Sequence, residues 1–187
     1  MIIAETDRLI IRNWKPADAD LFHLINSDDA VMEFFPSRRD RAQSDEMMVV
    51  LTDRIDRTGY GFFAVERKAD AAPIGFTALS RTDLEPHLPN GTVEVGWRMA
   101  PQYWGTGYAT EAALAMLRLG FEQRNLAEIV AFAVAANRRS TAVMKRIGLR
   151  RDPSRDFDHP RVPETHPHLK RHVVYAMTAE EWNSEAR

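Results

Sequence analysis

The sequence predicts an α+β (α/β) fold, in which one mixed, mostly antiparallel twisted sheet of about seven strands is flanked by helices. Residues 93–99 alternate apolar and polar side chains, as a half-buried strand does. Residues 109–120 repeat small and apolar residues at helical spacing. Residues 129–135 are apolar on both faces, which is typical of a central strand. We expect the element order β-α-α-β-β-β-α-β-α-β-β.

The other elements follow from periodicity and from residues that start or stop them. Residues 8–13 have the pattern of a strand, and Pro16 suits the first turn of a helix reaching about residue 26. A short helix is expected at residues 29–35. A longer helix at residues 40–58 ends at Gly59. Further strands are expected at residues 61–66 and 74–81, a turn at 89–91, a helix that starts at Asn137 and stops at Gly148, and a last strand that includes Tyr175.

Length and composition limit the classes of protein. With 187 residues, we expect a single domain spanning residues 1–187. The absence of cysteine excludes disulfides, thiolate metal sites and a thiol nucleophile. A net charge of -2 argues against a nucleic-acid partner. No basic leader with an apolar run and no stretch of about 18 apolar residues is present, so we expect a cytoplasmic protein, monomeric or homodimeric, without a membrane partner.

A strand that runs through a glycine turn into a helix is the strongest functional signal. Gly105 and Gly107 lie between the strand at 93–99 and the following helix, and such a helix start binds anions through free N–H groups. No lysine and hydroxyl residue follow at the spacing of a nucleoside-triphosphate loop. The dinucleotide-binding fingerprint G-x-G-x-x-G/A fits Gly105 and Gly107, but Thr110 stands where its third small residue is needed. The dinucleotide interpretation is weakened but stays open.

Two ordered motifs carry a family resemblance. The spacing Gln102-x-x-Gly105-x-Gly107 resembles the coenzyme A pyrophosphate loop of the GNAT acetyltransferases, and the helix containing Asn137 and Ser140 resembles the helix after that family's fifth strand. The start ETDRLIIRNW and the end YAMTAEEW resemble the branch containing ribosomal-protein alanine N-acetyltransferases. The resemblance covers nearly the whole chain. It implies the GNAT fold and acetyl transfer from acetyl-coenzyme A, without a metal, to a primary amine in a small molecule or at a protein N-terminus.

The resemblance also implies a set of site residues. Acetyl transfer needs a base, because an amine with a pKa of about 10.4 is mostly protonated at neutral pH. Glu94 is the candidate base, and Ser140 is the candidate proton donor to the departing thiolate, since Met144 stands where the family usually has tyrosine. The main-chain N–H of Met99 would stabilise the oxyanion. The implied coenzyme-binding residues are Trp97, Arg98, Met99, Gln102, Trp104, Gly105, Thr106, Gly107, Tyr108, Ala109, Asn137, Ser140 and Lys145.

Several alternatives remain open at this point. Ser140 is equally consistent with a small packing residue, and Tyr175 is a reserve proton donor. Loss of the tyrosine is also consistent with a non-catalytic acyl-coenzyme A binder of the same fold. Glu128, about twenty residues beyond the loop, keeps a nicotinamide-dependent enzyme as a weaker alternative. Residues 157–172 are rich in proline and histidine, match no metal motif and are expected to form a substrate-side flap.

Overall fold

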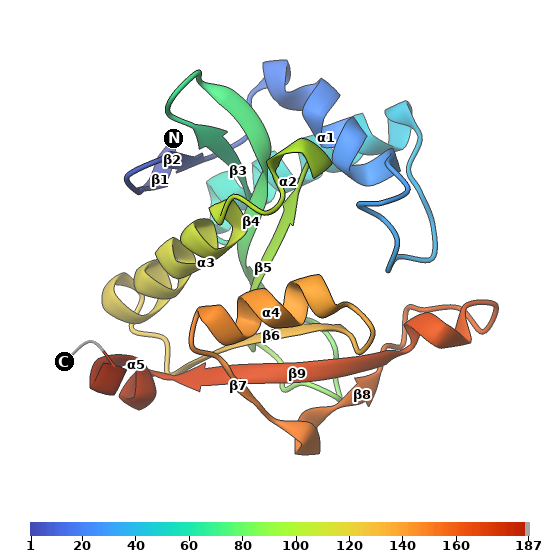
Figure 1. Ribbon diagram of the computed structural model, residues 1–187, viewed down its shortest axis with the longest axis vertical. Helices are drawn as coiled ribbons and strands as arrows, with labels where there is room; N and C mark the ends of the chain where they lie inside the picture. Colours follow the sequence, from blue (N-terminus) through green and yellow to red (C-terminus); the bar gives the residue numbers. More distant parts are fainter. Residues whose placement is uncertain (186–187) are drawn as a thin grey trace.

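The polypeptide forms one mixed sheet with helices packed against it, as Figure 1 shows. The computed structural model describes residues 1–185, so the last two residues of the expected domain lie outside the described part. Within it, the strand order is β1-β2-β3-β4-β5-β6-β9-β7, and β8 also pairs with β9. The strands are Ile2–Glu5 (β1), Leu9–Arg12 (β2), Gly61–Arg67 (β3), Ala72–Arg81 (β4), Val93–Met99 (β5), Glu128–Val134 (β6), Arg150–Arg151 (β7), Phe157–Asp158 (β8) and Arg171–Thr178 (β9).

Five α-helices and several shorter helical turns connect the strands in the described residues. Leu119–Gln123 forms a π-helical turn that continues the third α-helix. The α-helices are Ala19–Ser27 (α1), Arg41–Thr58 (α2), Tyr108–Arg118 (α3), Arg138–Arg146 (α4) and Ala179–Glu185 (α5), and the 3-10 turns are Pro16–Asp18, Pro101–Tyr103, Pro153–Arg155 and Pro167–Leu169.

Helix boundaries have local causes in the sequence. Asp40 caps α2 by accepting a hydrogen bond from the Gln43 N–H at 2.8 Å, while the Gln43 side chain accepts one from the Asp40 N–H at 3.1 Å. Gly59 ends the helix in the left-handed region with φ 71°. The expected stop at Gly148 has the same cause, with φ 85°. The predicted boundaries of both helices are confirmed.

The predicted short helix at residues 29–35 is wrong. The Asp28 carboxylate accepts hydrogen bonds from the Ala30 and Val31 N–H groups, both at 2.9 Å, and this side-chain turn replaces the helical pattern. Residues 28–40 instead form a connection between α1 and α2, which we call the α1–α2 loop. The predicted sheet was also too small, because β1 and a further two-residue strand were not expected.

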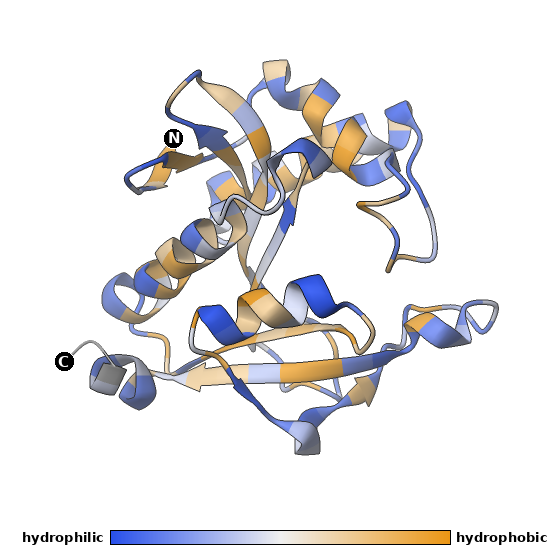
Figure 2. Ribbon diagram, in the orientation of Figure 1, coloured by the Kyte–Doolittle hydropathy of each residue, from blue (hydrophilic) through white to orange (hydrophobic). Residues whose placement is uncertain are grey.

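The core lies between the sheet and the helices on its two faces. Gly120 illustrates the tightness of this packing, since a Cβ atom there would lie 2.5 Å from the Ile129 Cδ1. Trp14 and Phe22 pack edge to face with ring centroids 4.7 Å apart. Figure 2 shows that the middle of α4 is hydrophobic and that both of its ends are hydrophilic.

Candidate functional site

The sheet splits between β5 and β6, two parallel strands that lie side by side at one point. Glu94 and Val130 are their only registered pair in the described residues. The Ala100 N–H donates a hydrogen bond to the Ile74 carbonyl, and the Thr82 N–H donates one to the Thr92 carbonyl. These two bonds show which residue pairs of β4 and β5 are hydrogen-bonded to each other. Because bonded pairs alternate in an antiparallel ladder, the main-chain groups of Trp97 and Met99 point away from β4 and into this β5–β6 split. The split therefore offers the main-chain groups of Trp97 and the N–H of Met99, while the Met99 carbonyl accepts a hydrogen bond from the Trp104 indole.

The glycine loop leads from β5 to an uncapped helix start. Gly105 and Gly107 have φ angles of 74° and 85°, the left-handed region that favours glycine. A Cβ atom at Gly105 would meet nothing within 4 Å, so the space beside this residue is open. The backbone conformation, and not a lack of room for a side chain, therefore requires glycine at this position. Gly107 is the N-cap of α3, and no side chain caps this end. The first N–H groups of α3 are consequently available to an anion.

Arg8, which the sequence analysis did not single out, holds this loop. Its Nη1 donates to the Thr106 carbonyl at 3.1 Å, and its Nε donates to the Glu111 carboxylate at 2.6 Å. Its guanidinium also lies over the Tyr108 ring, 4.6 Å from the centroid. Glu111 accepts a further hydrogen bond from the Thr6 hydroxyl at 2.5 Å. Because these partners are about 100 residues apart in sequence, periodicity carries no signal for them.

Trp104 joins the loop to the other side of the split. Its indole Nε1 donates to the Met99 carbonyl at 2.8 Å. The Arg139 guanidinium of α4 lies 4.3 Å from the centre of the Trp104 ring and donates a 2.6 Å hydrogen bond to Glu33 in the α1–α2 loop. These contacts cross between elements before and after the split. Trp104 thus has a structural role in shaping the loop.

The remaining predicted coenzyme-binding residues lie around the same loop or on α4. The Thr106 hydroxyl donates to the Tyr103 carbonyl at 2.6 Å, which tightens the turn. Gln102 and Lys145 are exposed, the former in the turn after β5 and the latter near the end of α4. Tyr108 and Ala109 are half-buried in the first turn of α3.

Glu94 lies half-buried on the face of β5 that also carries Gly96 and Arg98. Its carboxylate makes no hydrogen bond or ion pair with any residue in 1–185. Burial raises the pKa of the Glu94 carboxyl to about 7; nearby Arg161 lowers the pKa and Asp83 raises it, both to a smaller extent. A carboxyl group with this pKa exchanges protons readily at neutral pH, as a general base must.

The start of α4 has the predicted geometry. The Asn137 side chain accepts a 3.0 Å hydrogen bond from the Ser140 N–H, so Asn137 is the N-cap. Ser140 is half-buried, and its hydroxyl has no hydrogen-bond partner within the described chain. Met144 and Tyr175 are core residues, 2% and 5% exposed. Because Ser140 is less buried than Tyr175, a substrate can reach Ser140 more easily than this reserve candidate.

The proline- and histidine-rich segment is partly ordered by pairing rather than irregular throughout. Phe157 pairs with His172 across β8 and β9, and the His159 and His172 rings lie 4.8 Å apart. Arg161 forms an ion pair with Asp83, which ties this segment to the connection between β4 and β5. The expected function of a substrate-side flap stays a prediction. Among residues 1–185, no group of three or more His, Cys, Asp or Glu is arranged to hold a metal ion.

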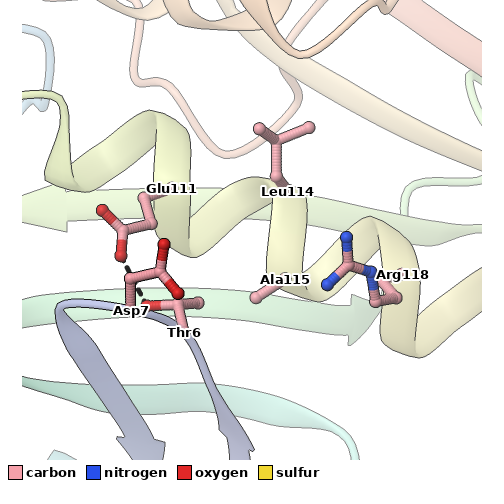
Figure 3. A pocket seen from close by; sticks show the side chains of 6 residues that line it. All are labelled: Thr6, Asp7, Glu111, Leu114, Ala115 and Arg118. Atoms are coloured by element: carbon pink, nitrogen blue, oxygen red, sulfur yellow. Dashed lines mark hydrogen bonds between the residues drawn. The ribbon is translucent and has the colours of Figure 1, made fainter.

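A separate hollow of about 230 Å³ lies beside α3 and contains none of the predicted site residues. Figure 3 shows Glu111 of α3 facing Thr6 in the turn between β1 and β2, with the Thr6–Glu111 hydrogen bond between them, and Arg118 further along the helix. Glu94 and the backbone groups that face away from β4 lie instead at the β5–β6 split. No helix in the described residues is both long and apolar enough to cross a bilayer.

Comparison with known proteins agrees with this geometry. The family model described as "Acetyltransferase (GNAT) domain" matches residues 8–150. The chain is 30% identical over 178 residues to YnaD of Bacillus subtilis (strain 168), named an uncharacterised N-acetyltransferase, covering 95% of this chain and 98% of YnaD. A crystal structure of a GNAT-family acetyltransferase from Bacillus anthracis superposes with a TM-score of 0.79 at 27% identity, covering 97% of this chain and all of that one.

A structure titled RimL, a ribosomal L7/L12 α-N-protein acetyltransferase in complex with coenzyme A, shares the fold with a TM-score of 0.76 at 13% identity, covering 97% of this chain and 99% of that one. An acyl-coenzyme A-dependent acetyltransferase is therefore the class of enzyme that fold and relatives define. The chain belongs to the GNAT acetyltransferase family, and the predicted family and fold are confirmed.

Proposed function

We propose that this enzyme transfers an acetyl group from acetyl-coenzyme A to a primary amine within a ternary complex. The observation that carries the proposal is Glu94, a partner-free carboxylate with a raised pKa at the point where β5 and β6 part. The RimL structure, whose title names bound coenzyme A, supports the choice of donor. The acceptor class is supported by YnaD, whose name describes an N-acetyltransferase.

The glycine loop fits the coenzyme by chemistry. A pyrophosphate would accept hydrogen bonds from the free N–H groups at the start of α3, in the space that Gly105 leaves open. Arg8 would keep the loop in place without contacting the ligand itself. The main chain of Trp97 and Met99 would bind the pantetheine arm, because their groups face the split. The main chain of Arg98 pairs with Phe76 of β4 and is therefore not available to the coenzyme. Asn137 and Lys145 of α4 would line the opposite side.

Each proton in the proposed reaction has an assigned group. Glu94, directly or through water, removes a proton from the ammonium form of the acceptor. The amine nitrogen then forms a bond to the acetyl carbon, and the Met99 N–H stabilises the developing oxyanion. As the carbon–sulfur bond breaks, the sulfur keeps the electron pair and takes a proton from the Ser140 hydroxyl, which regains a proton from solvent. The second proton of the attacking nitrogen leaves through Glu94 or solvent.

The alternative is an acyl-coenzyme A binder of the same fold that lacks catalysis, and Glu94→Gln separates the two. Glutamine keeps the shape and cannot accept a proton, so kcat/KM should fall by about 10²- to 10⁴-fold while coenzyme A affinity is kept. Thiol release would be followed with peptide N-termini, polyamines and amino acids as acceptors, and coenzyme A binding by calorimetry. Glu46→Gln is the matched control, since Glu46 is exposed on α2.

Two results would contradict the proposal. Wild-type protein that binds coenzyme A but releases no thiol with any amine would favour the non-catalytic binder. Full activity of Glu94→Gln at neutral pH would leave acetyl transfer standing but remove Glu94 as the base.

A further inference from the structure

Arg98 is a half-buried cation that lacks a carboxylate partner, and this inference rests on the proposed amine acetylation. Its Nη1 donates to the Asn26 side-chain oxygen at 2.7 Å and to the Ile25 carbonyl at 3.4 Å. No acidic side chain in residues 1–185 forms an ion pair with it. A buried charge is costly unless it is paired, so the missing partner calls for an explanation.

The unused edge of the guanidinium is shaped to bind an anion. The Nε and Nη2 groups of Arg98 make no hydrogen bond within the described chain, and together they form the planar fork that binds a carboxylate through two parallel bonds. The rings of Phe35 and Phe76 lie 4.4 Å and 5.1 Å from the guanidinium carbon. These aromatic contacts hold the side chain in place and exclude water from it.

A second cation lies close to the first. Burial, and then the positive charge of Arg39, lower the pKa of Arg98 to about 10, which still leaves Arg98 charged at neutral pH. Arg39 is in the α1–α2 loop, and its N–H donates to the Asn26 carbonyl at 2.9 Å. The Arg39 side chain is exposed and forms no hydrogen bond or ion pair in the described residues. An anion bound between the two arginines would relieve their repulsion.

The same strand face connects this cationic site to the proposed base. Glu94, Gly96 and Arg98 alternate along β5, so Gly96 is two residues from each. A Cβ atom at Gly96 would touch just the Ala78 Cβ, at 3.7 Å, which leaves the surface between the two charges free of bulky side chains. Four residues of strand span about 13 Å. At about 3.3–3.6 Å per extended residue, a peptide of three to four residues has this length.

We propose that the acceptor is a peptide of three to four residues whose free carboxylate binds the Arg98 fork, assisted by Arg39, while its amine reaches Glu94. The carboxylate replaces the ion-pair partner that Arg98 lacks. Arg98 is then a specificity-determining residue, and it distinguishes carboxylate-bearing amines from polyamines and from amines whose carboxyl group is blocked.

The test compares two mixtures of the same tripeptides and tetrapeptides, one with free carboxylates and one with C-terminal amides, each supplied with acetyl-coenzyme A. Products are quantified by mass spectrometry. A hydrogen-bonded charge pair should give the wild type a preference for the acids of about 10- to 100-fold in kcat/KM. Arg98→Met should bring this ratio close to one, Arg98→Lys should keep part of it, and Arg39→Gln should reduce it less. Because the acid-to-amide ratio is measured within each variant, a general loss of folded protein lowers both rates equally and leaves the ratio unchanged.

Equal wild-type rates for acids and amides would overturn the inference and leave the proposed function intact. So would an Arg98→Met protein with weakened coenzyme A affinity and an unchanged acid-to-amide ratio, because the anion would then belong to the coenzyme. If the wild type acetylates no amine, the proposed function fails. Calorimetry on the coenzyme A-loaded protein then compares the binding of N-acetyl tripeptide and tetrapeptide acids with that of the corresponding amides. Tighter binding of the acids supports the site, and equal or absent binding overturns it.

Discussion

Arg8 Nη1 donates a 3.1 Å hydrogen bond to the carbonyl of Thr106, which joins the first hairpin to the glycine loop across 98 residues of sequence. The same guanidinium binds Glu111 one turn into α3. The loop thus has a rigid support at Thr106 and beside Gly107. The conformation of an anion-binding loop matters for affinity, because a loop that is already ordered loses less entropy when it binds.

We therefore predict that Arg8→Ala weakens coenzyme A binding by about 5- to 30-fold, the value of one or two charge-assisted hydrogen bonds. Calorimetry with coenzyme A measures this change. Lys68→Ala is the control, because Lys68 pairs with Glu5 in the same hairpin and does not contact the loop. Unchanged affinity in Arg8→Ala, or equal losses in both variants, would contradict the prediction.

The pH dependence of activity should report the Glu94 carboxyl. The base must be ionised, so kcat/KM should rise with pH and level off above a pKa of about 7. Arg161→Gln removes a positive charge that favours the carboxylate and should move this inflection up. Asp83→Asn removes a negative charge and should move it down. Both groups are exposed, so shifts of a few tenths of a pH unit are expected, and they should shrink with added salt.

These two variants act as controls for each other, because each breaks the same Asp83–Arg161 ion pair. Shifts in the same direction would mean that the loss of the loop contact, rather than the charge, controls Glu94. Rate measurements over pH 5 to 9 at low ionic strength would distinguish the two cases.

His159 should make the protein sensitive to acid. Burial lowers the pKa of His159 to about 4, and the positive charges of His172, Arg161 and His87 contribute further. Since the folded pKa lies below the unfolded value of about 6.5, this stability is present above pH 6.5 and is lost as the pH falls towards 4. In His159→Gln, the free energy of unfolding should therefore fall less between pH 6.5 and pH 4 than in the wild type, by on the order of 2–3 kcal/mol.

Urea unfolding at several pH values measures this effect, with His168→Gln as the control for an exposed histidine in the same segment. A profile of His159→Gln as steep as that of the wild type between pH 6.5 and 4 would rule out the assignment to His159.

Gly120 should tolerate no added methyl group without loss of stability. Its Cβ would lie 2.5 Å from the Ile129 Cδ1, and Ile129 is fully buried. We expect Gly120→Ala to lower the free energy of unfolding by about 1–3 kcal/mol. Ile129→Val removes the clashing carbon, so the double variant should lose less than the sum of the single losses. Additive losses in denaturant unfolding would show that the clash is relieved in another way.

Much of the fold could be predicted because its signals are local. The alternation in β5 and the caps at Asn137 and Gly148 depend on neighbours within a few residues. One strand was expected between the helix that stops at Gly148 and β9, but two are present, β7 and β8. The second could not be predicted, since pairing with β9 alone makes these two-residue segments strands. The expected helix at residues 29–35 failed because propensity was outweighed by one carboxylate, that of Asp28.

The site divides in the same way. The glycines of the loop could be identified from spacing, because their left-handed conformation is a local property. The contact of Arg8 with Thr106 and the influence of Arg161 on Glu94 join segments far apart in the chain. Sequence periodicity contains no information about such pairs, so the support of the loop and the electrostatics of the base required the structure.

The raised pKa of Glu94 has a consequence for how the chain exchanges protons with solvent as it folds. Near pH 6, Glu94 takes up almost a full proton on folding, because its pKa rises from 4.5 to about 7. His159 releases about three-quarters of a proton, because its pKa falls from 6.5 to about 4. For these two groups the exchanges nearly cancel, so folding near pH 6 in effect moves most of a proton from an imidazole to a carboxylate, and their contribution to the heat of unfolding should hardly depend on the buffer.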